Sequence, residues 1–311
     1  MKVITSGSAY LDIDAYAGCI AYAELLNLQG EQAVAASTAI WNESITPTIR
    51  MWPTELQTTY QANADDTFVI IDLSELRYFD TFVDPQRVVE VIDHHPGFED
   101  YWQERIGKGA NIEFIGAACT LVYERWQQAG LLDQMSSTSA RLLSAGILDN
   151  TLKFLAGVTS ERDKKAYAEL VKHADLDDDW PAQYFGECQQ SMLKNIAKAL
   201  QTDTKTAHYP SLDHAIDAGQ LVVWDAAEII TNHMQTIQET MNLSGPEWFV
   251  NIVSISEGKS YLLAADLNVQ KFLERALAVL FKDHVAVADR LWLRKEIMKQ
   301  DISMAAKRTE T

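Results

Sequence analysis

The chain has 311 residues and a formal net charge of −18, from 26 Lys and Arg against 44 Asp and Glu. Hydrophobic residues make up 47% of it, with only 14 Gly and 7 Pro, which excludes disordered and collagen-like chains. A chain of this length predicts about two domains. The excess of negative charge disfavours nucleic acid polymers and anionic membranes as partners.

Cysteine content and hydropathy indicate the cellular compartment of the protein. Three cysteines, Cys19, Cys119 and Cys188, are too few and too odd in number for a disulfide framework, which indicates a reducing compartment. The first residues lack the apolar core of a signal peptide, and no apolar run approaches the ~20 residues of a membrane span. We therefore expect a cytoplasmic protein.

Short apolar runs alternate with amphipathic stretches in the first half. The pattern predicts strands at 2–5, 68–71, 88–92 and 112–115, and helices at 14–28, 118–129, 137–148 and 160–174. Gly30 is expected to stop the first helix, and Ser160 with Asp163 forms a variant of the capping box. Strands alternating with helices predict βαβ units and a largely parallel sheet.

A second α/β pattern follows an acidic segment at 175–181, which holds four Asp and is typical of a solvated linker or a frayed helix end. Helices are predicted at 187–200, 226–241 and 269–280, and strands at 221–224, 248–255 and 260–265. We therefore expect an α/β protein with an N-terminal parallel-sheet domain, 1–180, with flanking helices, and a smaller C-terminal α/β domain, 188–305.

The strongest local signal is Asp93-His94-His95, at the end of an apolar strand. Ligands bind at the carboxyl ends of strands in parallel α/β sheets, so these side chains are candidates for a site. Two surface histidines adjacent by chance remain the alternative.

Further carboxylates follow other predicted elements. Asp12 and Asp14 lie two residues apart after the first strand, and in an extended segment such residues project to the same side. Asp72 ends the strand 68–71, and Asp149 lies in a Gly-Ile-Leu-Asp-Asn-Thr run. Helix capping and turn formation are the alternative roles for these carboxylates.

Four carboxylates and an imidazole at one sheet edge would repel one another without a counter-charge. A mixed Asp and His ligand set suits Mn²⁺ or a similar divalent ion better than Ca²⁺. Two ions bridged by a carboxylate can share a water, lower its pKa and direct it at phosphorus. We therefore expect two Mn²⁺ ions, with Mg²⁺ or Co²⁺ as alternatives, and a phosphate-containing substrate.

The order of these motifs resembles the DHH phosphoesterase superfamily, over most of the chain. The turn 115–120 resembles the glycine-and-threonine turn that follows Asp-His-His in that superfamily, and 152–163 resembles its Phe…Thr-x-Glu-x-Asp stretch. Asp203-Thr204-Lys205 and Leu293-Arg294-Lys295 resemble the basic signatures of the smaller domain of manganese-dependent (family II) inorganic pyrophosphatases and of the exopolyphosphatase and prune branch.

The resemblance implies a role for each matched residue. It implies a catalytic domain that binds the metals, a smaller domain that binds the substrate, and an active site in the cleft between them. Asp93 would orient the histidines and would count with His95 and Asp149 as catalytic, while His95 would contact phosphate or assist proton transfer. The implied metal ligands are Asp12, Asp14, Asp72 as the bridge, His94 and Asp149. The implied phosphate contacts from the smaller domain are Arg294, Lys295 and Lys205, a solvated helical face being the alternative for the first two.

Two positions depart from the pyrophosphatase pattern. Gly7-Ser8 stands where those enzymes have Gly-His, and a hydroxyl is a poor ligand, so we expect one metal site to be weaker and richer in oxygen ligands. The pyrophosphatases' Ser-Arg-Lys-Lys is here Leu293-Arg294-Lys295-Glu296, which removes one cation and adds an anion. The first change argues for the exopolyphosphatase and prune branch, which also lacks that histidine, or for a divergent one. Both changes argue against fast hydrolysis of pyrophosphate but not against phosphoanhydride chemistry.

The resemblance therefore implies a metal-dependent hydrolase that cleaves the phosphoanhydride bonds of inorganic pyrophosphate or short polyphosphate, by attack of a hydroxide bridging the metals. One alternative is a phosphodiesterase acting on cyclic nucleotides or short oligonucleotides. The other is a regulatory member that has lost catalysis. Expected partners are a small phosphate-containing substrate and no nucleic acid polymer or membrane, and a homodimer is compatible with the resemblance.

Overall fold

The computed structural model describes residues 1–212 and 214–309, without the side chains of residues 295 and 305–309. The chain divides into two compact units, Met1–Tyr184 and Phe185–Thr311. Each unit has its own sheet, so the predicted α/β class with a parallel sheet followed by a second α/β part is confirmed. Over the residues described, no helix is both long enough and apolar enough to cross a membrane.

The sheet of the first unit is parallel and has the strand order β3-β2-β1-β4-β5-β6. Its strands are β1 (Lys2–Thr5), β2 (Ala33–Ala36), β3 (Leu56–Gln57), β4 (Thr67–Ile71), β5 (Val88–Asp93) and β6 (Ala110–Ile112). The chain runs outward from β1 in one direction and then returns to continue from β4 in the other. β1 and β4 therefore flank a topological switch point, where doubly wound folds bind ligands.

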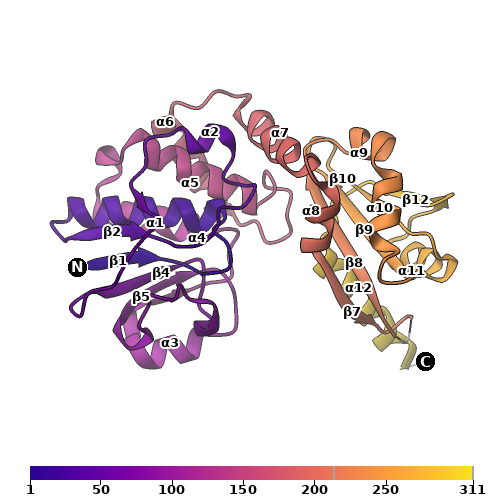
Figure 1. Ribbon diagram of the computed structural model, residues 1–311, viewed down its shortest axis with the longest axis horizontal. Coiled ribbons are helices and arrows are strands. Elements are labelled where there is room, and N and C mark those ends of the chain that lie inside the picture. The colour runs from indigo at the N-terminus through magenta and orange to yellow at the C-terminus, as the bar shows by residue number, and fades with distance from the viewer. Residues whose placement is uncertain (213, 310–311) are drawn as a thin grey trace. The chain divides into compact units, whose positions relative to one another are not determined.

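Helices cover both faces of this sheet (Figure 1), with α1, α4 and α5 on one side and α3 on the other. The helices are α1 (Ile13–Leu28), α2 (Pro47–Arg50), α3 (Glu99–Ile106), α4 (Ala118–Ala129), α5 (Ser137–Asn150) and α6 (Glu161–Ala174). Short 3₁₀ turns are η1 (Leu76–Tyr78), η2 (Pro85–Arg87), η3 (Gly107–Gly109) and η4 (Leu132–Gln134). Trp102 of α3 is fully buried against Phe68 and Val91 of the sheet. Burial of both faces explains the continuous apolar runs of β4 and β5.

Close packing of α1, α4 and α5 depends on glycine. A Cβ at Gly146 of α5 would lie 2.5 Å from Cys119 Sγ and 3.2 Å from the Asp14 Cα. A Cβ at Gly18 of α1 would lie 2.5 Å from a methyl group of Ile71. Because a hydrogen is the only side chain that fits, α5 approaches the first turn of α1, and the segments that carry Asp14 and Asp149 come together.

The second unit has a mixed sheet with the strand order β11-β12-β10-β9-β8-β7, in which only the β8–β9 pair is parallel. Its strands are β7 (Thr204–Tyr209), β8 (His214–Val223), β9 (Trp248–Ser254), β10 (Lys259–Leu263), β11 (Phe281–Lys282) and β12 (Val285–Ala288). Its helices are α8 (Ile196–Thr202), α9 (Ala227–Asn232), α10 (Met234–Met241), α11 (Leu267–Leu277) and α12 (Arg294–Thr309), while α7 (Trp180–Leu193) contains the boundary between the units. Hydrophobic clusters fill both faces of this sheet, one with α11 and α12 and the other with α8, α9 and α10.

Most predicted elements are present, including α4 at its predicted bounds and the capping box of Ser160 and Asp163.

The strand predicted at 112–115 is wrong, because β6 ends at Ile112 and the chain then leaves the sheet. The helix predicted at 187–200 is two helices, because Asn195 caps α8 by accepting a hydrogen bond from Lys198 N at 3.0 Å. The helix predicted at 226–241 likewise breaks at His233. The acidic segment also ends earlier than predicted, since Pro181 lies in the first turn of α7.

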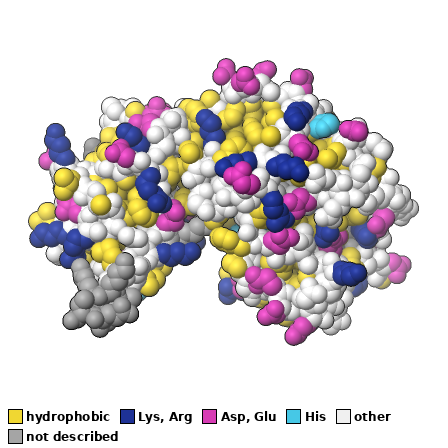
Figure 2. All heavy atoms as spheres, turned by 180° about the vertical axis from the view of Figure 1, so that it is seen from behind, with side chains coloured by type: hydrophobic (Ala, Val, Ile, Leu, Met, Phe, Trp, Pro, Cys, Tyr) yellow, Lys and Arg dark blue, Asp and Glu magenta, His cyan; other side chains and the backbone are white. Residues whose placement is uncertain are grey.

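Charged side chains of both signs are mixed over the face shown in Figure 2, with hydrophobic areas between them. The acidic excess of the chain is therefore not gathered into one patch on this face. Some acidic groups are buried instead, and two of them, Asp14 and Asp93, lie at the edge of the first sheet.

We predict that Gly146→Ala destabilises the protein. The new methyl group must displace Cys119 or the α1 backbone, and overpacking of this kind costs roughly 1–3 kcal/mol. Urea unfolding followed by circular dichroism measures the change. Gly186→Ala in α7 is the matched control, because its Cβ would meet no atom within 4 Å, and we expect it to be neutral or stabilising. An unchanged midpoint for Gly146→Ala would contradict the packing argument.

Candidate metal centre

The sequence-predicted residues of the first unit meet at the carboxyl ends of β1, β4 and β5. Asp12 follows β1 as the N-cap of α1, Asp72 follows β4 directly, and Asp93 is the last residue of β5. Asp72 has φ of 60°, a left-handed conformation that a non-glycine residue adopts at some cost. This backbone strain indicates that the interactions of the Asp72 side chain, and not the regular geometry of the strand, determine the conformation of the residue.

Asp12 and Asp14 both accept backbone hydrogen bonds at helix N-termini. Asp12 Oδ1 accepts from Ala15 N at 3.0 Å. Asp14 reaches across to α4, where its Oδ2 accepts from Ala118 N and its Oδ1 from Cys119 N, each at 2.8 Å. The α4 N-cap residue, Ala117, has no side-chain acceptor of its own, so Asp14 supplies the missing cap. The capping roles foreseen for these carboxylates are therefore present.

His94 is held so that one ring nitrogen faces the carboxylates. Its Nδ1 lies 3.0 Å from the carbonyl oxygen of Ile115, which makes Nδ1 the protonated donor of the neutral ring. Its Nε2 lies 3.2 Å from Asp72 Oδ1 and 3.9 Å from Asp14 Oδ2. Burial would lower the pKa of His94, but the adjacent Asp72 and the charge of Asp14 raise it to about 10.

Burial and mutual repulsion raise the pKa of three of the carboxyl groups. Burial is the main cause for Asp72, and the charges of Asp14 and Asp12 add to it. Burial also raises the pKa of Asp12, and it raises that of Asp149 to about 7, against a hydrogen bond from Tyr184 that lowers it. Tyr184 is fully buried, and its hydroxyl lies 2.9 Å from Asp149 Oδ1.

Asp93 contacts both histidines. Its Oδ1 accepts from His94 N at 2.7 Å and from His95 N at 3.1 Å, and it lies 2.9 Å from His95 Nδ1. Burial alone would raise the pKa of Asp93, but the hydrogen bond from His95 and its charge lower it. The His95 ring is 61% exposed, so its other nitrogen is open to a ligand.

These residues fit a divalent cation. Oxygen and nitrogen atoms of Asp72, His94 and His95 all lie within 4.8 Å of one another, and Asp12 and Asp14 are near enough for their charges to act on Asp72. Asp72 Oδ1 is buried and lies 3.2 Å from His94 Nε2, so without a cation it depends on the proton of a charged His94 ring, and a cation could take the place of that proton. A cation would also offset the repulsion that raises these pKa values. This group includes Asp72 and His94 from the predicted ligand set and adds His95, for which a phosphate contact was predicted.

A buried network behind His94 positions the carbonyl group that orients it. The Asp163 carboxylate accepts from Gly116 N at 3.2 Å, from Thr120 Oγ1 at 2.6 Å, and from the backbone and hydroxyl of Ser160 at 2.7 and 2.8 Å. Gly116 follows Ile115 directly, so the network anchors the turn whose carbonyl accepts from His94. A Cβ at Gly116 would lie 2.6 Å from Asp163, which explains glycine there.

In the second unit, the matched basic residues lie near one another. Arg294 Nη2 pairs with Asp203 Oδ1 at 2.8 Å, and its Nη1 donates to the carbonyls of Asp203 and Ala218. Lys205 is exposed on β7, two residues beyond Asp203. Lys295 lies in α12, and its side chain is outside the described part. Asp203 thus serves as the partner of Arg294, a contact that the sequence did not indicate.

Three contributors at the centre were missed by sequence reasoning. Asn150 donates from its side chain to Asp14 Oδ2, the Ile115 carbonyl accepts from His94, and Tyr184 donates to Asp149. Asn150 directly follows Asp149 in the Gly-Ile-Leu-Asp-Asn-Thr run, so the sequence could have indicated it as a site residue. A backbone carbonyl and a tyrosine 35 residues from its partner leave no local pattern.

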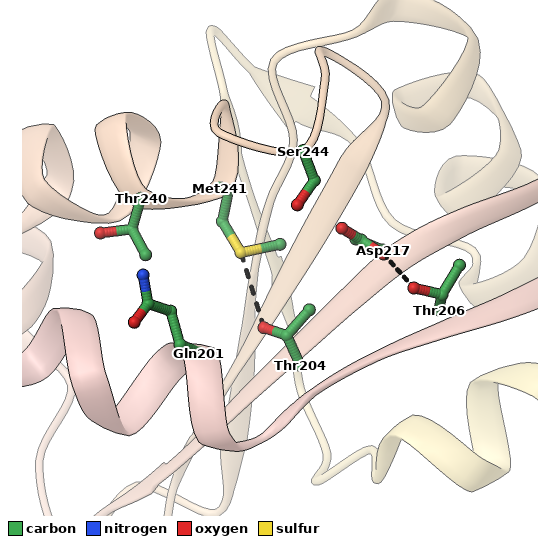
Figure 3. Close-up of a pocket in the computed structure, with 7 residues that line it drawn as sticks. All are labelled: Gln201, Thr204, Thr206, Asp217, Thr240, Met241 and Ser244. Atoms are coloured by element: carbon green, nitrogen blue, oxygen red, sulfur yellow. Dashed lines mark hydrogen bonds between the residues drawn. The ribbon is translucent and has the colours of Figure 1, made fainter.

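A polar pocket of about 240 Å³ in the second unit has a different character (Figure 3). Thr206 Oγ1 donates to Asp217 at 2.5 Å, and Thr204 Oγ1 lies 3.7 Å from the sulfur of Met241. The residues drawn there include neither histidine nor a basic group, so this pocket lacks the donor set found in the first unit.

Comparison with known proteins supports the predicted resemblance. No protein-family model matches the chain. A Bacillus licheniformis protein named as a manganese-dependent inorganic pyrophosphatase is 23% identical over 98% of this chain and 99% of its own length. A similarly named Bacillus pumilus protein is 23% identical over 95% of this chain and 96% of its own length.

Solved structures agree in fold. A Methanococcus jannaschii protein assigned to the family II inorganic pyrophosphatases has a TM-score of 0.62 at 16% identity, over 97% of this chain and all of that one. An exopolyphosphatase-related protein of Bacteroides fragilis has a TM-score of 0.50 at 14% identity, over 99% of this chain and 92% of that one. The chain is thus similar in sequence to proteins named as manganese-dependent inorganic pyrophosphatases and similar in fold to these two solved structures, in agreement with the predicted resemblance.

We predict that Asp163→Asn destabilises the fold and loosens His94. An amide presents one oxygen and two N–H groups to donors that now share a carboxylate, and an unsatisfied buried donor costs roughly 1–3 kcal/mol. Urea unfolding tests the stability, and the imidazole NMR resonances of His94 test its orientation. Asp178→Asn, at an exposed position, is expected to change stability by less than about 0.5 kcal/mol. Equal effects of the two changes would contradict the role of the network.

Proposed function

We propose that this protein is a metal-dependent phosphohydrolase that cleaves the phosphoanhydride bond of inorganic pyrophosphate or short polyphosphate. The observation that carries the proposal is the meeting of Asp12, Asp72, His94 and Asp149 at the switch point of the first sheet. Relatives named as manganese-dependent inorganic pyrophosphatases support both the metal and the substrate class.

Five residues form the proposed ligand set: Asp12, Asp14, Asp72, His94 and Asp149. Asp72 is the proposed bridge, because it is buried beside His94 Nε2 and is also within range of the charges of Asp12 and Asp14. Asp14 Oδ1 accepts one hydrogen bond and so keeps one lone pair for a ligand role. When bound, two Mn²⁺ ions would neutralise phosphate oxygens and lower the pKa of an attacking water.

The chain's own residues orient these groups and move a proton. The Ile115 carbonyl fixes the His94 tautomer, so that Nε2 faces the centre. Asp93 holds His95 Nδ1, which leaves the exposed Nε2 to hydrogen-bond a phosphate oxygen or to transfer a proton to the departing one. Tyr184 restrains Asp149 by its hydrogen bond.

Phosphate contacts from the second unit are proposed for Lys205, Arg294 and Lys295. The hydrogen bonds to Asp203 and Ala218 use three of the five guanidinium N–H groups of Arg294. Two N–H groups remain to bind phosphate. The contact with Asp203 would fix the direction of these two N–H groups and reduce the side-chain entropy that Arg294 loses when phosphate binds.

Ser8 distinguishes this chain from the pyrophosphatase pattern. Its hydroxyl donates to the carbonyl of Tyr78 at 3.4 Å, and the residue is exposed. We propose that one of the two metal sites lacks an imidazole ligand and consists of oxygen donors, so it would bind its ion more weakly and accept Mg²⁺ more readily than a histidine-containing site.

We predict that Asp149→Asn abolishes phosphate release from pyrophosphate and tripolyphosphate while the protein still folds. The amide keeps the shape but removes a negative charge from the ligand set. Phosphate release with Mn²⁺ measures turnover, and circular dichroism measures folding. Asp133→Asn, an exposed change, is the control and should retain full turnover.

Removal of metal by chelation should abolish the same activity, and Mn²⁺ should restore it. If the wild-type protein keeps its ions yet hydrolyses neither substrate, nor longer polyphosphate, the proposed function is wrong. Fewer than one tightly bound ion per chain after incubation with Mn²⁺ would instead favour a regulatory protein.

We predict that Tyr184→Phe weakens Mn²⁺ binding by roughly tenfold, as losing a hydrogen bond that orients a ligand typically does. Titration with Mn²⁺, followed by calorimetry, measures the dissociation constant without relying on turnover. Tyr167→Phe is the matched control, since the Tyr167 ring packs on Phe154 and it is the Tyr184 hydroxyl that binds Asp149. Equal dissociation constants for wild type and Tyr184→Phe would contradict the role of the hydroxyl.

A further inference from the structure

A pocket of about 400 Å³ lies beside the metal centre, within the first unit. Asp12, Asp72 and His95 form one side of it, so it is continuous with the proposed phosphate site. Its remaining wall includes the aromatic rings of Tyr10, Tyr78 and Phe98. The pocket therefore joins an acidic, metal-binding side to an aromatic side.

The aromatic wall is accessible and held in position. Tyr10 is 59% exposed and Tyr78 is 44% exposed, both high for such large side chains. The guanidinium of Arg77 lies 4.6 Å from the centre of the Tyr78 ring, and Arg77 in turn pairs with Glu75. Phe98 is half-buried and packs edge-on against Tyr101. Restrained aromatic rings lose little entropy when they bind a ligand.

The binding of inorganic pyrophosphate would not require these aromatic rings. Pyrophosphate is small and charged over its whole surface, and it would gain nothing from contact with three aromatic rings. A planar aromatic ligand gains from both burial and stacking. Pockets of this size commonly hold a ligand with one polar and one apolar end.

We propose that the substrate of this site carries an aromatic base: a nucleoside 5′-diphosphate or triphosphate, with its terminal phosphate at the metal centre and its base against Tyr10, Tyr78 and Phe98. The inference rests on the proposed function, because it places the same phosphoanhydride cleavage at the same residues. It extends the substrate class from inorganic phosphoanhydrides to nucleotides that contain the same type of bond.

The reaction needs no additional reactant. The oxygen of a water forms a bond to the terminal phosphorus, and the bond from that phosphorus to the bridging oxygen breaks. The electron pair of the broken bond stays on the bridging oxygen of the departing nucleotide. ADP and water thus yield AMP, inorganic phosphate and a proton, which passes through the exposed ring of His95 to solvent.

The test compares ADP with pyrophosphate, using the Mn²⁺-loaded full chain and phosphate release. The variants are Tyr78→Ala and Tyr10→Ala, with Tyr78→Phe and Tyr10→Phe as matched controls that keep the rings. We expect each alanine variant to lower kcat/KM for ADP roughly tenfold more than it lowers kcat/KM for pyrophosphate, the effect of losing one stacked ring. The phenylalanine variants should retain the wild-type ratio of the two activities.

A binding measurement accompanies the kinetics. AMP should inhibit the wild-type protein at a concentration roughly tenfold lower than inorganic phosphate does, and Tyr78→Ala should remove this advantage. Hydrolysis of pyrophosphate without ADP cleavage, or equal losses on both substrates in the alanine variants, would overturn the inference and leave the proposed function standing. Hydrolysis of neither substrate by a metal-loaded wild-type protein would overturn both.

Discussion

Repulsion between buried carboxylates is the constraint on which the first unit depends. Burial raises the pKa values of Asp12, Asp72 and Asp149, and the negative charge of Asp14 raises all three further. Such an arrangement persists only if other parts of the fold hold the charges in place. Backbone N–H groups of α1 and α4, the amide of Asn150 and the hydroxyl of Tyr184 do so. Ligand atoms of Asp72, His94 and His95 then lie within 4.8 Å of one another, where a divalent cation would offset the negative charge.

The same constraint explains why neutral groups surround the centre so closely. The Ile115 carbonyl accepts from His94, and Asp163 fixes the turn that carries this carbonyl. Gly146 and Gly116 allow the close approach of helices and turns that these hydrogen bonds require. Stability and ligand geometry are therefore coupled here, because the glycine contacts that close the core also position the carboxylates.

The net charge of −18 acquires a different meaning once the carboxylates are located. This acidic excess argues against the binding of a long polyanion along the surface. Basic side chains are interspersed with the acidic ones on the face seen in Figure 2 and form no separate basic patch there. The acidic excess does not argue against a small phosphate compound, since bound cations reverse the sign of the local potential. The pocket lined by Tyr10 and Tyr78 adds an apolar surface beside the charge, which is the basis for inferring a nucleotide.

The sequence by itself determined the strands β4 and β5, most of the principal helices and the carboxylates that end these elements, because periodicity and capping are local properties of neighbouring residues. It also pointed to Asp93, His94 and His95 before any contact was known. Only the tertiary structure decided that Asp14 caps α4, that Tyr184 binds Asp149 and that Asp203 pairs with Arg294. These contacts join residues 35 to 104 positions apart, so no local pattern encodes them. Packing against distant parts of the chain likewise ended β6 at Ile112, where the chain turns away to place the Ile115 carbonyl beside His94.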